Sequence, residues 1–193
     1  MYGEGRAYGL ELFLKKKKGK LTGWVSYTLA RSEGSFEDID KGNWFPTKQD
    51  RTHDISLVGI WALSERVKLS STFVYYTGNA VTFPTGKYVI DNQTINLYSE
   101  RNGSRMPNYH RMDIGLTIDN KKFKEIKNPD TGEIEKIKKK VESSWNFSVY
   151  NVYGRENAYS ITFQEQANDP TKTEIVQLSL FKIIPSISYN FRF

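Results

Sequence analysis

The chain has 193 residues, with 28 Lys and Arg against 22 Asp and Glu, a formal net charge of +6, and no cysteine. This length fits one domain or part of one. The lack of cysteine excludes a disulfide scaffold, a cysteine-ligated zinc site and a thiol nucleophile. No stretch approaches the roughly 18 apolar residues of a membrane helix, and residues 1–20, which end in KKKKGK, lack the apolar segment of a signal peptide.

Alternation of apolar and polar residues with a period of two, which is typical of strands with two different faces, recurs along the chain. It is clearest at the C-terminus, where Ile187, Tyr189, Phe191 and Phe193 alternate with polar residues. No amphipathic helix is expected. The predicted fold class is therefore all-β and antiparallel, with about seven long strands over residues 6–16, 20–33, 51–63, 66–77, 108–124, 142–153 and 184–193.

The predicted connections alternate in length. Residues 15–20 and 63–66 form tight turns, whereas 34–50, 78–107 and 154–183 form long loops. The connection 125–141 contains the turn sequence NPDTGE and predicts a small hairpin. The last loop predicts another, because AYSITF and EIVQLSLF flank the turn-rich NDPTK. Short turns at one end and long loops at the other are typical of an outer-membrane β-barrel, whose alternating lipid-facing and polar residues give a polar composition.

Five segments, in order along the chain, resemble the C-terminal part of TonB-dependent outer-membrane receptors of the Bacteroidetes type. They are YGLELFLKKKKGKLTGWVSYTLARS, DRTHDISLVG, MPNYHRMDIGLT, SSWNFSVYNVYGREN and IIPSISYNFRF. The resemblance covers nearly all 193 residues. It implies an antiparallel transmembrane barrel of 22 strands, of which residues 1–193 supply the last part, with long external loops and short periplasmic turns.

The resemblance also implies a function and partners. The parent protein is expected to be a receptor of the bacterial cell outer membrane that takes part in TonB-dependent uptake of a chelated metal, a vitamin or a glycan, without enzymatic activity or a cofactor. The expected partners are outer-membrane lipid, the rest of the barrel, the plug domain and the barrel-assembly machinery, with TonB reached only through the plug and no nucleic acid bound. No segment resembles a plug domain, a TonB box or a signal peptide, so the sequence is expected to be a fragment, because an isolated sheet would leave two edges unpaired in lipid.

Two sets of aromatic residues are predicted to act in the membrane. The C-terminal strand, with Ile187, Tyr189, Phe191 and Phe193, is interpreted as an assembly signal, because an exposed edge can be recognised by strand addition. An ordinary edge strand is the alternative. Residues near strand ends are predicted to lie at the lipid–water interface, where amphipathic rings are favoured, or alternatively to pack a soluble core. They are Tyr27, Trp61, Tyr75, Tyr76 and Trp145.

The long loops supply the candidate ligand contacts. Aromatic side chains there suit glycans and arginines suit anionic chelates, although loop aromatics also pack loops together. The predicted external contacts are Trp44, Phe45, Phe83, Tyr88, Tyr98, Arg101 and Arg105.

The basic runs and the histidines have simpler interpretations. Residues 15–18, the lysines at 121, 122 and 124, and the run 136–140 are interpreted as solvated turns rather than a nucleic-acid site. His53 beside Asp54 and His110 near Asp113 are interpreted as polar pairing inside the barrel rather than a metal site. No catalytic motif is recognised.

Two alternative functions remain open from the sequence. One is a self-contained small outer-membrane barrel or adhesin-like surface protein, with the hairpin of the last loop recruited into the wall. The other is a soluble β-sandwich binding module, which the aromatic C-terminus and the loop asymmetry disfavour.

Overall fold

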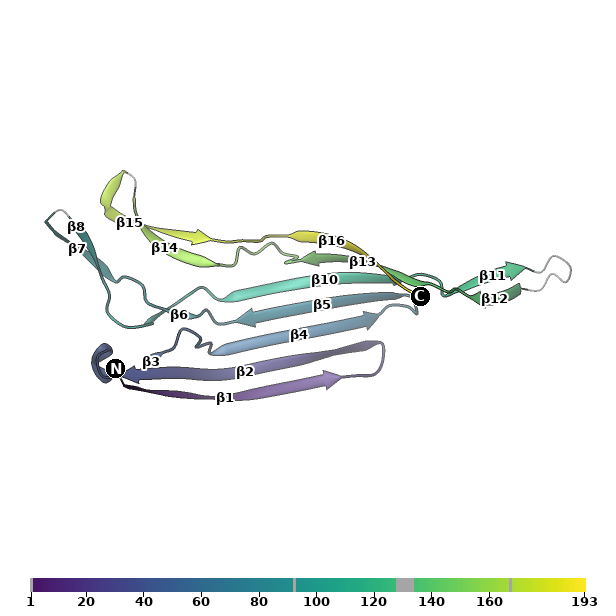
Figure 1. The fold of residues 1–193 in the computed structure, drawn as a ribbon, viewed down its shortest axis with the longest axis horizontal. Helices are drawn as coiled ribbons and strands as arrows, with labels where there is room; N and C mark the ends of the chain where they lie inside the picture. The colour runs from purple at the N-terminus through teal and green to yellow at the C-terminus, as the bar shows by residue number, and fades with distance from the viewer. Residues whose placement is uncertain (1, 92, 128–133, 167) are drawn as a thin grey trace.

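The computed structural model describes residues 2–91, 93–127, 134–166 and 168–193. Its long strands lie side by side along the long axis of the molecule (Figure 1), and one short 3-10 turn, Asp40–Gly42, interrupts a loop. The predicted all-β antiparallel class is confirmed. The described part contains 16 strands, however, rather than seven, because the connections carry short strands of their own.

The seven predicted long strands form one antiparallel sheet and follow one another in chain order. Six of them begin and end within three residues of their predicted bounds, whereas the predicted strand 108–124 ends five residues early, at Asp119. The agreement arises because the two-residue period that reveals a strand also fixes which side chains face the same way. A two-residue strand, β3 (Phe45–Pro46), pairs with β2 as an eighth member. The seven are β1 (Gly3–Lys16), β2 (Leu21–Phe36), β4 (His53–Ala62), β5 (Val67–Tyr76), β10 (Tyr109–Asp119), β13 (Glu142–Tyr150) and β16 (Ile184–Arg192).

The sheet is open and does not close into a barrel. β1 pairs only with β2, and β16 pairs only with β13, so each has one unpaired edge within the described part of the chain. These edges lie on opposite sides of the sheet in Figure 1. Open edges of this kind are templates for pairing with further strands.

The two ends of the sheet differ in their connections. At the turn end lie the connections 17–20 and 63–66 and the predicted hairpin of β11 (Phe123–Lys127) and β12 (Ile134–Lys138), whose NPDTGE turn falls outside the described residues. The predicted hairpin of the last loop is also present. It lies at the opposite, loop end and pairs β14 (Ser160–Gln166) with β15 (Asp169–Leu178).

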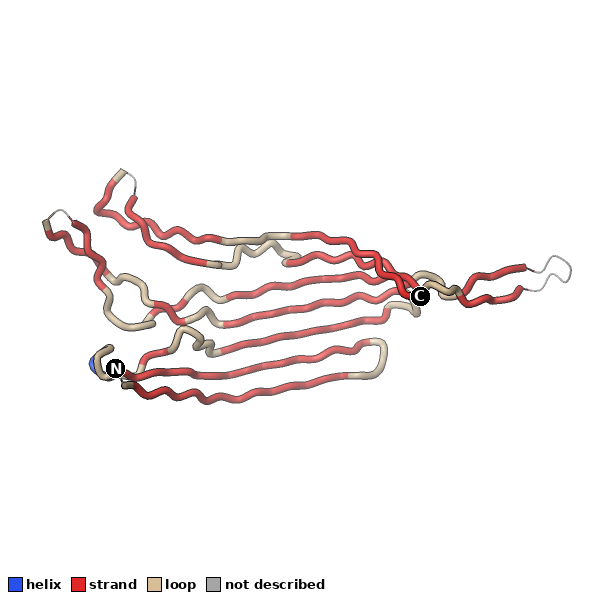
Figure 2. The backbone as a smooth tube through the Cα atoms, viewed as in Figure 1, coloured by secondary structure: helices blue, strands red, loops and turns tan. Residues whose placement is uncertain are grey.

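The long loop between β5 and β10 contains strands that the sequence did not predict. β7 (Gly86–Ile90) pairs with β8 (Gln93–Leu97), and β6 (Ala80–Val81) pairs with β9 (Ser104–Arg105). Figure 2 shows these short strands extending the loop end beyond the long strands, while the turn end carries one protruding hairpin. No helix in the described residues is long and apolar enough to cross a membrane.

The sheet is a single layer without a core. Among the described residues, only Phe45 and Ala80 are buried apolar residues, and the other sheets are two-stranded. Folded soluble domains normally pack two layers of secondary structure around a core. Here the apolar side chains of the long strands remain uncovered.

Candidate functional site

One face of the sheet is apolar from edge to edge. The pairing register places Leu12, Tyr27, Ile55 and Tyr75 in one cross-strand row, and the apolar residues of β10, β13 and β16 continue on the same face. Many of these side chains are exposed, including Leu57 in the middle of the sheet. We call this surface the apolar face. Its members include Leu10, Leu14, Val25, Leu29, Trp61, Leu69, Phe73, Ile114, Leu116, Ile118, Trp145, Phe147, Val149, Ile187, Tyr189 and Phe191.

Aromatic residues with polar tips line the loop end of the apolar face. The Tyr27 hydroxyl lies 3.0 Å from Nδ1 of His53, and the Tyr153 hydroxyl lies 2.7 Å from Nδ1 of His110. Asn108 donates a hydrogen bond of 3.0 Å to the Tyr75 hydroxyl. The two histidines therefore each have their own tyrosine partner, and both lie on the apolar face rather than beside one another.

The turn end of the apolar face carries the larger rings. Trp61 lies opposite Leu21 and Leu69, and Trp145 packs on Tyr189 with ring centroids 4.7 Å apart. Four of the five predicted interface aromatics thus lie on one face, two near each end. Tyr76 lies on the other face, because it follows Tyr75 directly in a strand and successive side chains point to opposite sides.

The predicted assembly signal lies on an unpaired edge. Every residue of β16 is exposed. Ile187, Tyr189 and Phe191 extend the apolar face to that edge, and Phe193 follows the end of the strand. The rings of Tyr189, Phe191 and Phe193 lie in sequence, with centroids 6.3 and 5.6 Å apart.

The opposite, polar face is cross-linked by side chains. Asn146 donates to the Thr117 hydroxyl at 2.9 Å, and Lys68 pairs with Asp119 at 2.9 Å. Arg111 pairs with Asp113 at 3.1 Å. Asp54 also lies on this face, opposite Tyr76, so both aspartates that neighbour the histidines in sequence have their side chains on the polar face.

At the loop end of the polar face, aromatic rings and arginines form two stacks, which hydrogen bonds from Arg111 join into one cluster. Tyr76 and Tyr109 are parallel, with ring centroids 4.5 Å apart. Arg51 lies 4.0 Å over the Tyr76 ring. Arg111 lies 4.1 Å over Tyr150 and donates to the hydroxyls of both Tyr109 and Tyr150.

Arg51, Tyr76, Tyr109 and Tyr150 of this cluster form one wall of a cavity of about 1030 Å³ beneath the long loops. The other walls come from the loop between β5 and β10 and from the last loop. A volume of this size suits a small organic ligand. Its aromatic and charged lining residues are Lys48, Arg51, Tyr76, Phe83, Tyr98, Arg101, Tyr109, Tyr150, Tyr159, Phe163 and Phe181.

The cavity lining is positively charged. Lys48, Arg51 and Arg101 line it, and no Asp or Glu does so in the described part of the chain. Arg51 is partly engaged, because it donates to Asn79 at 2.9 Å and lies 3.8 Å from Asp54. The arrangement can bind an anionic group with the cations and a ring or sugar face with the aromatic side chains.

Three of the seven predicted loop contacts line this cavity: Phe83, Tyr98 and Arg101. Tyr88 is exposed on the β7–β8 hairpin, away from the lining. Trp44 stacks under Arg6 at 4.2 Å, and Phe45 is buried against Phe36.

Arg105, the seventh predicted contact, is tied to structure. It pairs with the carboxylate of Asp50 and donates to the backbone carbonyls of Asp50 and Gly78 at 3.0 and 3.1 Å. Asp50 is 1% exposed and also accepts a 2.6 Å hydrogen bond from the backbone N–H of Ser32. The pair joins two long loops to β2, so its role is to hold the loop end together.

Sequence reasoning missed Arg51, Tyr109 and Tyr150 as lining residues. The sequence did contain a signal for two of them. Tyr109 and Tyr150 lie at the loop ends of predicted strands, and the two-residue period places them on the same face as the polar residues.

Comparisons of the chain with protein-family models, with curated proteins and with solved structures gave no match.

Proposed function

We propose that the sheet is a membrane-embedded wall segment of an outer-membrane β-barrel, and that the parent barrel is a TonB-dependent receptor that takes up a nutrient. The observation that carries the membrane part is a single-layer sheet with one continuous, uncovered apolar face and a cross-linked polar face. In such a wall the apolar face contacts lipid and the polar face lines the interior. The two unpaired edges are where further strands of the barrel pair.

The dimensions of the apolar face support this placement. On β4 the face runs from His53 to Trp61, a distance of eight residue steps, or about 27 Å along the strand at 3.4 Å per residue. A strand tilt of about 40° reduces this to a height of about 21 Å, close to the roughly 25 Å of a barrel's apolar band. Aromatic rings with polar tips at both limits match the interfacial girdles of such barrels.

The receptor part of the proposal is supported by the five collinear motifs and by the cavity at the loop end. A nutrient carrying an anionic group and a ring or sugar would contact Arg51, Arg101, Phe83 and Tyr98. The terminal strand, with its aromatic residues on an open edge, is suited to recognition by assembly machinery through strand addition.

Single-cysteine labelling tests the membrane placement, because the natural chain has no cysteine. Ser56 and Leu57 are neighbours in the middle of β4 and point to opposite faces. The full chain carrying Ser56→Cys or Leu57→Cys is reconstituted in phospholipid vesicles and treated with a water-soluble maleimide. We expect rapid labelling at position 56 and strong protection at position 57, with both positions labelled once the protein is unfolded.

Equal labelling at the two positions in vesicles would contradict the lipid-facing assignment. A soluble, monomeric chain that stays in solution without detergent would favour a β-sandwich instead. The receptor part is tested separately by sequencing the transcript that carries these codons: a plug domain encoded in frame ahead of residue 1 supports it, and a secretion signal joined directly to residue 1 contradicts it.

A further inference from the structure

The charges of the chain are distributed unevenly between the two ends of the sheet. The connections at the turn end, residues 15–20, 64–68 and 119–142, contain 15 of the 28 Lys and Arg but only 7 of the 22 Asp and Glu, a net charge of +8. The rest of the chain has 13 against 15, or −2. The excess positive charge of the molecule therefore lies entirely at the turn end.

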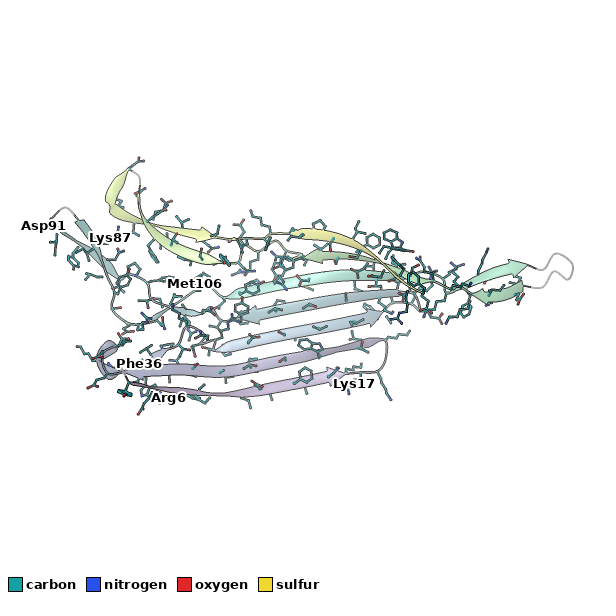
Figure 3. The ribbon with its side chains drawn as sticks, in the orientation of Figure 1. Arg6, Lys17, Phe36, Lys87, Asp91 and Met106 are labelled. Atoms are coloured by element: carbon teal, nitrogen blue, oxygen red, sulfur yellow. The ribbon has the colours of Figure 1, made fainter. Side chains whose placement is uncertain are left out.

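The lysines at the turn end begin where the apolar face stops. Leu14 and Leu21 are the last apolar residues of β1 and β2 before the turn, exposed by 72% and 53%. Lysines occupy positions 15–18 and 20 between them, all exposed. Figure 3 shows Lys17 at this turn, at the opposite end of the β1–β2 pair from Arg6 and Phe36.

These lysines are available to a partner. No carboxylate of the described residues forms an ion pair with the lysines of 15–20. Elsewhere at this end, Lys68 is paired with Asp119, and Lys122 and Lys138 share Glu142 at 3.6 and 3.7 Å. At the loop end, by contrast, Arg31 shares Glu33 with Arg6, and Arg105 pairs with Asp50.

We propose that the turn-end lysines bind the headgroups of anionic phospholipids in the leaflet on that side of the membrane. This inference rests on the proposed membrane placement. Each residue beyond Leu14 or Leu21 adds about 3.4 Å, and the headgroup layer is about 5–7 Å thick on each side of the hydrocarbon core. By strand parity Lys16 lies on the apolar face with Leu14, whereas Lys15 lies on the polar face opposite Trp24. The ammonium groups of residues 16–18 therefore lie at headgroup depth, where lysine side chains extend along apolar surface toward the charged layer.

Charge selects the anionic lipid over the zwitterionic one. In phosphatidylcholine the choline cation neutralises the phosphate, whereas phosphatidylglycerol keeps a net negative charge. Each lysine near an anionic surface adds about 1 kcal/mol, which corresponds to roughly a fivefold preference. The rest of the chain, at −2, offers no such preference.

Trp61 is placed to report which lipid is bound at this end. It lies opposite Leu21, and the next residue, Ala62, donates a 2.8 Å hydrogen bond to the carbonyl of Lys20. The full chain with Trp24, Trp44 and Trp145 replaced by Phe keeps Trp61 as its one tryptophan. It is reconstituted in mixed phosphatidylcholine and phosphatidylglycerol vesicles of fixed composition, with either one lipid or the other brominated to quench fluorescence.

At low salt, we expect brominated phosphatidylglycerol to quench Trp61 about fivefold more effectively than brominated phosphatidylcholine. This quenching ratio should fall toward one near 1 M salt, where the Debye length is only about 3 Å. Lys17→Gln/Lys18→Gln should at least halve the ratio. The matched variant Lys41→Gln/Lys87→Gln removes the same charge at the loop end and should leave the ratio unchanged. A loop-end reporter, Tyr75→Trp with Trp61→Phe, should give a ratio near one.

A ratio near one for Trp61 at low salt would overturn the inference, as would a ratio that Lys17→Gln/Lys18→Gln does not change. Tight binding of a DNA oligonucleotide together with a ratio near one would assign the lysines to a soluble polyanion instead. Absence of quenching by either brominated lipid would overturn the proposed membrane placement itself, and with it this inference, so the two failures are distinguishable.

Discussion

At the scale of single residues, the loop end is held by a few buried or shielded carboxylates with arginine partners. Asp50 and Glu33 are the two main ones, and each is contacted by two arginines. Apart from Arg31–Glu33, these contacts join residues far apart in the sequence, so no local sequence pattern predicts them. For this reason Arg105 was predicted from its loop position to contact a ligand, whereas in the structure it forms an ion pair with Asp50.

The Asp50–Arg105 pair should be strongly coupled. Arg105→Ala leaves the buried Asp50 carboxylate with only Ser32 and a distant Arg31, 3.9 Å away, so we expect a loss of about 2–3 kcal/mol in the stability of the loop end. The double variant Asp50→Asn/Arg105→Gln should lose less than the sum of the two single changes. Protease cleavage rates of the long loops measure the effect. Additive losses would contradict the coupling.

The ionisation of Glu33 should make the stability of the loop end depend on pH. It lies beyond the apolar band, past Leu29, and hydrogen bonds from Arg6 and Arg31 lower its pKa below the ordinary value. Its stabilising contribution is therefore complete above the ordinary pKa of about 4.3 and is lost as the pH falls through the lower folded pKa.

Trp44, which stacks under Arg6, reports this transition by its fluorescence in a chain that retains only that tryptophan. We expect an acid transition below pH 4.3 that Glu33→Gln abolishes. A transition that persists in Glu33→Gln would assign it to another carboxylate.

At the scale of elements, the seven long strands and two hairpins were predictable because alternating polarity and turn residues are local signals. The β7–β8 hairpin was not, because its five-residue strands are too short to show a clear period. The prediction that Tyr75 and Tyr76 both lie at the lipid–water interface was wrong for Tyr76, because adjacent residues of a strand point to opposite faces. The cavity lining was predicted only in part, because Tyr76, Tyr109 and Tyr150 come together only when β5, β10 and β13 pair side by side.

Gly23 and Gly59 offer a matched test of the β2–β4 pairing, because they lie directly opposite one another. Gly23 has a φ of +153°, and a Cβ added there would lie 2.0 Å from the carbonyl oxygen of Val58, whereas a Cβ at Gly59 meets nothing within 4 Å. We expect Gly23→Ala to destabilise the sheet by about 2 kcal/mol or more and Gly59→Ala to be nearly neutral. Unfolding by urea in detergent measures both, and equal effects would refute the close approach.

At the scale of the whole molecule, the decisive property is a sheet whose apolar face is left uncovered by the part of the chain that the structure describes. Contiguous exposed apolar patches of that extent normally mark a surface that binds a partner or a membrane, or that drives association in water. The polar face, by contrast, carries hydrogen bonds and ion pairs between its own side chains. The two faces therefore require different surroundings.

This difference predicts opposite effects of the same substitution. Leu57→Arg places a charge near the middle of the apolar face and should cost about 2–4 kcal/mol in a bilayer, whereas Ser56→Arg on the polar face should cost little. Unfolding free energies measured in lipid vesicles compare the two. Equal costs would indicate that both faces contact water.

The order of the strands in the sheet also has a consequence for how the chain folds. Each long strand pairs with the next long strand along the chain, so the sheet can grow by adding one strand at a time. Closing the four-residue connection 63–66 costs less entropy than closing the 32 residues between β5 and β10, by about 2 kcal/mol on the logarithmic scaling of loop closure. The hairpins β1–β2 and β4–β5 should therefore form first, and the sheet should then assemble from preformed pairs.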